Sequence, residues 1–392
     1  MNNKTVAYHT LGCKLNFSET STISRQFEED DFEKKEFHEE ADVYIINTCS
    51  VTENADKECK QLIKKAKRSN PNATIVVTGC YAQLKPAYIA TLDGVDLVIG
   101  AGEKFNIVKH VNEYKKNGEA KICSCDIDDV EGFHTSYSLH DRTRTFLKVQ
   151  DGCDYSCSFC TIPLARGHSR SDTVQGVLEN VKELAKNNIQ EVVLTGVNLG
   201  DFGKGYNGAR SGSEHFFDLV KALDTQALIP RFRISSIEPN LLTDEIIEYV
   251  SKSKHFMPHF HIPLQSGSKE ILANMKRRYK KELYADRVKK IKTLMPHACI
   301  GVDVIVGFPG ETEENFEETF RFLHELDISY LHVFTYSERE NTLAVSMPKA
   351  VPIKVRKERN AILRNLSEKK MKYFTEKHLA QSRAVLFEHT EK

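Results

Sequence analysis

The sequence predicts an α/β protein with an amino-terminal open parallel sheet domain, residues 1–120, followed by a partial (β/α)6 barrel, residues 140–380. Three observations support this fold class. Short apolar runs alternate with segments whose apolar residues recur every three or four positions, which indicates parallel strands covered by helices. The alternation falls into two blocks, one of four units and one of six larger units. Polar and glycine-rich segments follow the strands of the second block, as at the mouth of a β/α barrel.

The first block contains four strand–helix units. The expected strands are 5–9, 43–46, 74–78 and 97–99. The expected helices are 18–29, 55–68, 83–92 and 103–114. The acidic run 28–42 is typical of a solvated helix end and loop, and residues 121–139 are expected to form a linker to the second domain.

Three cysteines follow three of these strands, and we call them the amino-terminal trio: Cys13, Cys49 and Cys80. The carboxyl ends of parallel strands line one crevice, where ligands bind. Three thiols at that edge can therefore converge on one metal centre and leave one coordination position open. The alternative is chance placement, because cysteine is a common buried residue and packs well as a small apolar side chain.

The amino-acid composition limits the classes of protein to which this chain can belong. The 392 residues include ten cysteines and no run of eighteen apolar residues, so we expect no membrane span. The first residues lack the apolar core of a signal peptide, and we expect a cytoplasmic protein whose thiols serve as metal ligands. The net charge of zero neither favours nor excludes a nucleic-acid partner. Cys59 is expected in a helix core, and Cys123 and Cys125 in incidental or strand-edge positions.

The second block contains six strand–helix units. The expected strands are 145–149, 191–194, 231–235, 258–262, 300–306 and 330–335. The expected helices are 174–186, 217–223, 243–251, 269–275 with 282–294, and 311–326. The polar and glycine-rich segments after strands two to six are 195–198, 235–238, 265–268, 307–311 and 336–339.

A loop after the first of these strands carries three further cysteines, which we call the barrel trio: Cys153, Cys157 and Cys160. Soft thiolates suit iron–sulfur clusters, and ferredoxin-type clusters take four cysteines. Three thiolates leave one iron open to bind a substrate. The alternatives are a structural zinc site completed from elsewhere, or three unrelated thiols. Zinc sites usually show paired C-x-x-C knuckles, and this C-x-x-x-C-x-x-C spacing does not.

The three-cysteine loop resembles that of the radical S-adenosylmethionine (SAM) enzymes, and the full set of motifs resembles the methylthiotransferases of that class. The motifs are TLGCKLNFSET, INTCSVT, TGCYAQ, DGCDYSCSFCTIPLARGHSRS, TGVNLG, HIPLQSGS followed by MKRRY, VIVGFPGETEENF and HVFTYSER. The resemblance implies two [4Fe–4S] clusters. The barrel trio would hold the cluster whose open iron chelates SAM, and the amino-terminal trio an auxiliary cluster.

Within this family, TLGCKLN with Lys14 is most similar to the branch that acts on N-threonylcarbamoyladenosine beside the tRNA anticodon. Isopentenyladenosine relatives typically have glutamine at this place, in FGC-Q-MN, and the ribosomal-protein branch reads LGC-x-KN. The resemblance implies that a 5′-deoxyadenosyl radical from SAM abstracts the adenine C2 hydrogen, and that methylated sulfur from the auxiliary cluster replaces it. The implied partners are the tRNA anticodon stem-loop and an electron donor such as flavodoxin or ferredoxin.

Two other functions stay open on the residues alone. The first is methylthiolation of isopentenyladenosine in tRNA or of a ribosomal protein. The second is of another class, a non-catalytic iron–sulfur redox sensor or RNA-binding protein. A sensor needs no SAM pocket, so the polar barrel rim favours the enzyme.

Residues at the barrel rim are the expected SAM contacts, with Glu238 and Gln265 as polar partners and Val306 and Gly307 as walls for adenine. The full candidate set is Phe159, Gly196, Asn198, Ser236, Glu238, Gln265, Val306, Gly307 and Tyr336. Basic residues beside the cluster loop and in the run 276–281 can hold phosphates. The candidate RNA contacts are Arg166, Arg170, Lys276, Arg277 and Arg278, and Tyr279 could stack a base.

The carboxyl-terminal part departs from the resemblance. Thr335 and Asn341 stand where relatives often have proline and glycine. The family usually ends in a small β-barrel RNA-binding module called TRAM. Here 353–379 predicts a long basic helix, and residues 381–392 form only the start of a truncated TRAM-like module. Either the chain is a shortened form or this member lacks the module.

Overall fold

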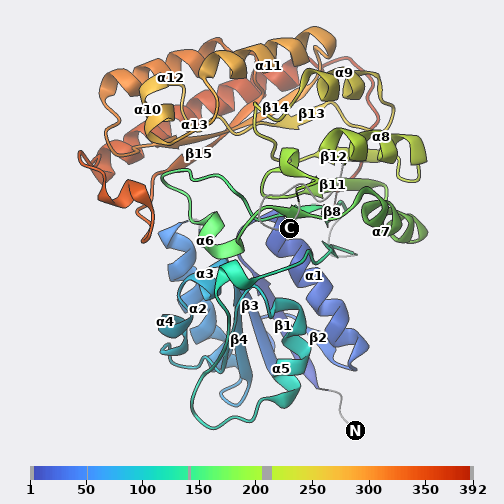
Figure 1. Cartoon of the computed structure of the whole chain (residues 1–392), viewed down its shortest axis with the longest axis vertical. Helices are drawn as coiled ribbons and strands as arrows, with labels where there is room; N and C mark the ends of the chain where they lie inside the picture. Colours follow the sequence, from blue (N-terminus) through green and yellow to red (C-terminus); the bar gives the residue numbers. More distant parts are fainter. Residues whose placement is uncertain (1–3, 51, 140–142, 205–213, 389–392) are drawn as a thin grey trace.

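The computed structural model of the chain describes residues 4–50, 52–139, 143–204 and 214–388. Two α/β bodies lie one above the other (Figure 1). The amino-terminal body is built on a six-stranded parallel sheet, and the second on two sheets that curve into a partial barrel. The short helices α3 (Cys80–Leu84) and α6 (Ile162–Arg166) contact each other where the two bodies meet. The open sheet followed by a partial barrel confirms the predicted fold class.

The amino-terminal sheet has the strand order β2-β1-β3-β4-β5-β6. Its strands are β1 (Thr5–Thr10), β2 (Glu33–Lys35), β3 (Val43–Thr48), β4 (Thr74–Gly79), β5 (Leu97–Ile99) and β6 (Lys121–Cys123). Its helices are α1 (Lys14–Glu29), α2 (Glu53–Ser69), α3, α4 (Pro86–Ala90), η1 (Lys104–Asn106) and α5 (Ile107–Glu113). Because β2 and β3 flank β1, the direction of winding reverses between β1 and β3. The crevice at such a reversal is where open α/β sheets bind ligands.

Three local expectations for this body were wrong. Strand β2 lies inside the acidic run 28–42, where a loop was expected; it is an edge strand, and edges tolerate charged residues. Strand β6 lies inside the expected linker and closes the other edge. The helix expected at 83–92 is two short helices that break at Lys85, because Pro86 disfavours the helical conformation in the residue before it.

The second body contains six parallel strands in chain order, linked across two sheets by the parallel bridges Phe232–Phe256 and Ser236–His261. These strands are β8 (Thr145–Lys148), β11 (Glu191–Thr195), β12 (Arg231–Ile234), β13 (His259–His261), β14 (Cys299–Val306) and β15 (Tyr330–Thr335). The short strands β7 (Ser136–Tyr137), β9 (Gln150–Asp151) and β10 (Arg170–Ser171) are added antiparallel, β7 beside β8 and β10 beside β9.

Helices cover the outer face of this barrel (Figure 1). They are α7 (Val174–Lys186), α8 (Phe216–Gln226), α9 (Asp244–Lys252), α10 (Lys269–Asn274), α11 (Lys281–Leu294), α12 (Glu313–Glu325) and α13 (Ile353–Glu376). Helix α6 lies instead where the two bodies meet, in contact with α3 and with the 3-10 turn η2 (Ile127–Asp129). Two further 3-10 turns are η3 (Leu199–Asp201) and η5 (Leu343–Ser346). Thr173, Thr243 and Thr312 cap α7, α9 and α12, and each hydroxyl accepts a backbone hydrogen bond, which fixes where the helix begins.

Side chains alternate between the two faces of the barrel strands. In β14, Val302, Val304 and Val306 are fully buried in the core beneath the helices. Asp303 and Ile305 are on the opposite, inner face and line a cavity. The strand register places Asp303 beside His332 of β15, so the inner face carries polar side chains where the outer face is apolar.

The end of the chain lies against the barrel. Within the described part, residues 381–388 form neither helix nor strand. Glu388 forms an ion pair with Arg144, and Arg231 donates a hydrogen bond to the carbonyl of Ala384. No helix among the described residues combines the length and the apolar character that a membrane span requires.

Candidate active site

The amino-terminal trio gathers at the winding reversal, because Cys13, Cys49 and Cys80 follow β1, β3 and β4, which are neighbours in the sheet. Two glycines allow the close approach. Gly12 has φ of +97°, and a Cβ there would lie 2.7 Å from the Cβ of Cys49 and 2.9 Å from its Sγ. Gly79 also has φ of +97°, and a Cβ there would lie 2.4 Å from a β3 carbonyl oxygen. A side chain at either position would push the loops apart.

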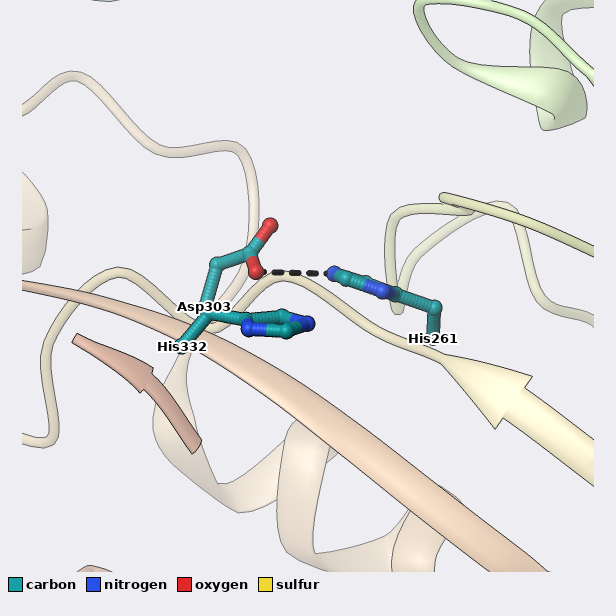
Figure 2. Close-up of side chains that lie close together, drawn as sticks. All are labelled: His261, Asp303 and His332. Atoms are coloured by element: carbon teal, nitrogen blue, oxygen red, sulfur yellow. Dashed lines mark hydrogen bonds and ion pairs between the residues drawn. The ribbon is translucent and has the colours of Figure 1, made fainter. Parts of the chain in front are cut away.

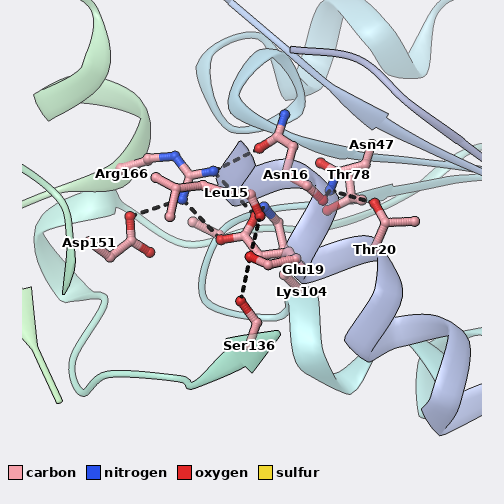
Figure 3. Close-up of polar contacts among 12 residues, drawn as sticks. Leu15, Asn16, Glu19, Thr20, Asn47, Thr78, Lys104, Ser136, Asp151 and Arg166 are labelled. Carbon is pink, nitrogen blue, oxygen red and sulfur yellow. Dashed lines mark hydrogen bonds and ion pairs between the residues drawn. The ribbon is translucent and has the colours of Figure 1, made fainter. Parts of the chain in front are cut away.

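A buried ion-pair network lies beneath this trio and joins the two bodies (Figure 3). The Arg166 guanidinium donates to Glu19 and Asp151, each at 2.9 Å, and to the Asn16 side-chain oxygen at 2.7 Å. Lys104 contacts Glu19 at 2.7 Å. Burial alone would raise the pKa of Glu19, but the charges of Arg166, Lys104 and Lys148 outweigh it and hold that pKa below its ordinary value.

The network carries more positive than negative charge. Two carboxylates, Glu19 and Asp151, face four cations: Lys104, Lys148, Arg166 and Arg170. Burial raises the pKa of the Cys80 thiol, while Arg166 and Lys104 act in the opposite direction. A surplus of cations beside a group of thiols fits a metal centre with anionic thiolate ligands. This observation supports an iron–sulfur cluster on the amino-terminal trio.

The barrel trio lies on the loop between β9 and α6. Burial raises the pKa of Cys153 and of Cys160 to about 12. Backbone N–H groups of Tyr155 and Ile162 each donate to one of these sulfurs at 3.4 Å. Hydrogen bonds to sulfur from nearby N–H groups are a feature by which proteins tune iron–sulfur clusters. None of these cysteines is in a disulfide, so the donor set fits a three-thiolate cluster.

Arg277 connects this loop to the barrel rim. Its guanidinium donates to Cys157 Sγ at 2.9 Å and to Glu238 Oε1 at 2.5 Å. The other Glu238 oxygen, Oε2, is buried and has no hydrogen-bond partner in the described structure. An orphan acceptor beside the cluster loop fits a donor from a bound ligand, such as a ribose hydroxyl of SAM.

A cavity of about 220 Å³ opens beside Cys160. Three of the predicted SAM contacts line it: Phe159, Gln265 and Tyr336. The Tyr336 hydroxyl is buried without a hydrogen-bond partner among the described residues. Apolar walls with a few convergent polar groups are typical of cofactor sites, so this cavity fits SAM next to the open corner of the barrel cluster.

The other predicted SAM contacts, Glu238 included, are not among the residues that line this cavity. Gly307 has φ of +76°, and a Cβ there would lie 2.2 Å from Cγ of Arg356, so it faces α13. Ile305, not the core residue Val306, is on the cavity wall. Gly196, Asn198 and Ser236 follow β11 and β12. Asn198 Oδ1 accepts a hydrogen bond from the backbone N–H of Glu238 at 3.2 Å. This bond connects the loop after β11 to the loop after β12.

Sequence reasoning missed several wall residues of the cavity. They are Thr52, Asp303, Phe334, Ser337 and Arg339. Asp303 and Ile305 could have been found from the two-residue period of the strand expected at 300–306, which places them on the face opposite the valines.

The two cysteine loops meet at this cavity. Ser50, which follows Cys49, lies with its Oγ 3.4 Å from Oγ1 of Thr161, which follows Cys160. Arg339 forms a bidentate ion pair with Asp56 of α2 at 3.0 and 3.1 Å. The amino-terminal sheet crevice and the barrel mouth are therefore adjacent.

The predicted RNA contacts divide into two groups. Arg166 and Arg277 are held by the buried bonds described above, and Arg170 donates to the carbonyls of Arg166 and His168, so these three offer no free guanidinium in this conformation. Lys276 and Arg278 are exposed. The prediction that Tyr279 stacks a base is wrong, because the ring is buried and its hydroxyl donates to the carbonyl of Leu264.

The fold and the three-cysteine loop define a radical SAM protein. Residues 147–323 match the model of the Radical SAM superfamily, and residues 5–100 match the model described as Uncharacterized protein family UPF0004. Among solved structures, the radical SAM methyltransferase TsrM from Kitasatospora setae shares this fold. Its TM-score is 0.64 at 14% identity, over 88% of this chain and 77% of that one.

Curated relatives define the family more narrowly. The chain is 42% identical to threonylcarbamoyladenosine tRNA methylthiotransferase MtaB of Bacillus subtilis, over 95% of this chain and 82% of the relative. It is 40% identical to the protein of the same name from Aquifex aeolicus, over 98% and 93%. A tRNA-2-methylthio-N(6)-dimethylallyladenosine synthase of Bacillus pumilus is 33% identical, over 93% and 73%. The chain belongs to the MtaB family of radical SAM tRNA methylthiotransferases.

Proposed function

We propose that this protein converts N-threonylcarbamoyladenosine beside the tRNA anticodon to its 2-methylthio derivative. The observation that carries the proposal is the family match across both bodies, together with two cysteine trios whose loops meet at one cavity. The higher identity to the threonylcarbamoyladenosine enzymes than to the dimethylallyladenosine enzymes favours this substrate. The reaction takes place where tRNA is found, in the cytoplasm, and needs an electron donor such as flavodoxin or ferredoxin.

Each trio holds one [4Fe–4S] cluster in this proposal, and SAM binds at the barrel cluster. When bound, these groups supply the radical that removes the C2 hydrogen and the sulfur that replaces it. The chain itself positions the reactants. Glu238 and Gln265 orient SAM, the apolar walls exclude water, and the Arg166 network fixes the sheet crevice against the barrel. Residues 1–120, extended by β6, form the auxiliary-cluster domain, and residues 140–380 the catalytic barrel.

Lys276 and Arg278 are the proposed RNA contacts that remain on the surface. Arg278 lies with its guanidinium 3.9 Å from the centre of the Tyr155 ring, beside the cluster loop. Exposed cations next to the active site can bind the phosphates that flank the modified nucleoside. Residues 381–392 have no proposed role in catalysis.

Replacing Glu238 by glutamine should weaken SAM binding by about 10-fold or more, because hydrogen bonds to a charged acceptor contribute about 1.5–3 kcal/mol. The measurement is equilibrium dialysis of SAM against the anaerobic holoenzyme. The control is Glu248→Gln on the exposed face of α9, which should bind like the wild type. Unchanged SAM affinity in Glu238→Gln would exclude this carboxylate as a contact.

The function itself is tested by nucleoside mass spectrometry of tRNA. A deletion strain should accumulate threonylcarbamoyladenosine and lack its 2-methylthio form, and the wild-type gene should restore it while Cys153→Ala does not. The proposed substrate would be wrong if the deletion strain lacked 2-methylthio-isopentenyladenosine instead. It would also be wrong if the tRNA of that strain were unchanged and a ribosomal-protein modification were lost. An unchanged profile in both would favour a non-catalytic sensor.

A further inference from the structure

A groove of about 790 Å³ opens from the proposed SAM cavity to the surface of the protein. It is bounded by the start of α2, by β15, which is the edge strand of its sheet, and by one face of α13. The groove and the cavity beside Cys160 have five wall residues in common: Thr52, Phe334, Thr335, Tyr336 and Ser337. The groove therefore leads to the place where the reacting nucleoside has to lie beside SAM.

A polar cluster marks the point where the cavity meets the groove. Asp303 lines the cavity and His332 lines the groove, and the strand register makes them neighbours. His261 Nε2 is 2.8 Å from Asp303 Oδ1 (Figure 2). The two imidazole rings are stacked at 22° to each other, so their in-plane lone pairs do not converge on one point as metal ligands do. The cluster is therefore a wall of hydrogen-bonding groups.

The groove has a surplus of positive charge. Four cations and two carboxylates line it: Lys57, Arg356, Lys357, Arg364, Glu53 and Glu338. The carboxylates pair with Lys57 at 2.8 Å and with Arg356 at 2.5 Å. Lys357 and Arg364 are exposed, and neither forms an ion pair with another described residue. The partner whose charge complements this wall is therefore a polyanion.

One face of α13 presents these two unpaired cations to the groove. Ile353, Lys357, Asn360 and Arg364 recur every three or four residues, which is the spacing of one helix face, and all four line the groove. Lys357 and Arg364 lie about 10 Å apart along the helix axis, at about 1.5 Å per residue. Each can therefore bind the phosphate of a different nucleotide.

An exposed aromatic ring lies where the groove joins the cavity. Phe334 is on the inner face of β15, lines both spaces and is 41% exposed. Proteins recognise single-stranded RNA loops by stacking unpaired bases on such rings and by hydrogen bonds to base edges. Asn54 and Asn360 add amide groups to the same wall. The groove thus combines a ring for stacking, amides for base edges and cations for phosphates.

We propose that this groove binds the single-stranded nucleotides next to the modified nucleoside, with Phe334 stacking a base and Lys357 and Arg364 binding phosphates. The inference rests on the proposed function, which brings an RNA loop to the barrel mouth. Continuity with the cavity favours the substrate as occupant, because the reacting nucleoside has to enter the cavity while its neighbours in the loop stay attached outside. These contacts extend the RNA-binding surface beyond Lys276 and Arg278.

The test is binding of a fluorescent anticodon stem-loop with threonylcarbamoyladenosine to the anaerobic holoenzyme over a range of salt concentrations. Lys357→Gln combined with Arg364→Gln should weaken binding about 10-fold or more. It should also reduce the slope of log K against log salt by about 1.4, since each phosphate contact on a single strand contributes about 0.7. Phe334→Leu, which keeps an apolar side chain without a flat ring, should weaken binding about 5-fold or more and leave the slope unchanged. The matched control, Lys182→Gln with Lys289→Gln, removes two exposed charges from α7 and α11 and should bind like the wild type.

Further readouts separate the possible failures. The variants should keep the wild-type iron content, so that weaker binding is not a lost cluster. Wild-type affinity and salt slope in the double variant of α13 would overturn the groove as an RNA site. If that variant instead cleaved SAM more slowly with reduced flavodoxin as electron source, the groove would be the docking site of the donor protein. Failure of the wild type to form methylthio product from this stem-loop would contradict the proposed function.

Discussion

Cys13→Ala should lose methylthio product by about 1,000-fold or more while still cleaving SAM reductively at close to the wild-type rate. Cys13 belongs to the amino-terminal trio, whose members follow the neighbouring strands β1, β3 and β4. The barrel trio and the SAM cavity lie in the other body and keep all their residues. The methyl group of alanine cannot replace a thiolate as a cluster ligand. Reductive cleavage of SAM should therefore continue, whereas formation of the methylthio product should stop.

The measurement combines two assays on one reconstituted sample: 5′-deoxyadenosine released from SAM, and the methylthio nucleoside formed in the stem-loop. Cys125→Ala, which removes an exposed thiol of the same body, should leave both unchanged. Normal product from Cys13→Ala would show that the amino-terminal trio does not supply the sulfur. Loss of both activities would show that the two sites are not independent.

Arg166→Met should destabilise the protein by about 3–5 kcal/mol, because removal of one partner leaves buried charges uncompensated. Glu19 and Asp151 would lose their shared guanidinium. The contact between α1 of the amino-terminal body and the cluster loop would lose its hydrogen bond to Asn16 as well. Arg166 is 4% exposed, so water cannot replace these bonds without opening the joint between the bodies.

Thermal unfolding of the anaerobic holoenzyme measures this loss. Arg68→Met, an exposed arginine near the end of α2, should change stability by no more than about 0.5 kcal/mol. If Arg166→Met unfolds at the wild-type temperature but binds tRNA more weakly, Arg166 does not have this structural role. It would then be an RNA contact, as the sequence predicted.

Much of this architecture could be predicted from the sequence, because strands buried on both faces read as short apolar runs. The strands β1, β3, β4 and β5 and all six parallel barrel strands lie where the alternation placed them. The cysteine trios were visible for the same reason, since each thiol of the amino-terminal trio lies within three residues of the end of such a run. Strand β2, with the sequence EKK, has no apolar residue and gave no signal.

The features that the sequence did not reveal depend on contacts between distant segments. Arg166 follows the cluster loop, and arginine is a residue type that often binds phosphate. In the structure it instead forms a buried ion pair with Glu19, which lies more than a hundred residues earlier in the chain. Arg277 lies in a basic run but is held by Glu238 and Cys157. Such partners depend on how the two bodies pack, which local periodicity does not encode.

Anaerobic iron counting of the holoenzyme and of two triple-alanine variants determines whether each cysteine trio holds its own cluster. A [4Fe–4S] cluster contributes four irons, so we expect about eight irons per chain in the wild type and about four when either trio is replaced. About four irons in the wild type would show that only one trio holds a cluster. Loss of nearly all iron when only one trio is replaced would show that the two trios do not hold separate clusters.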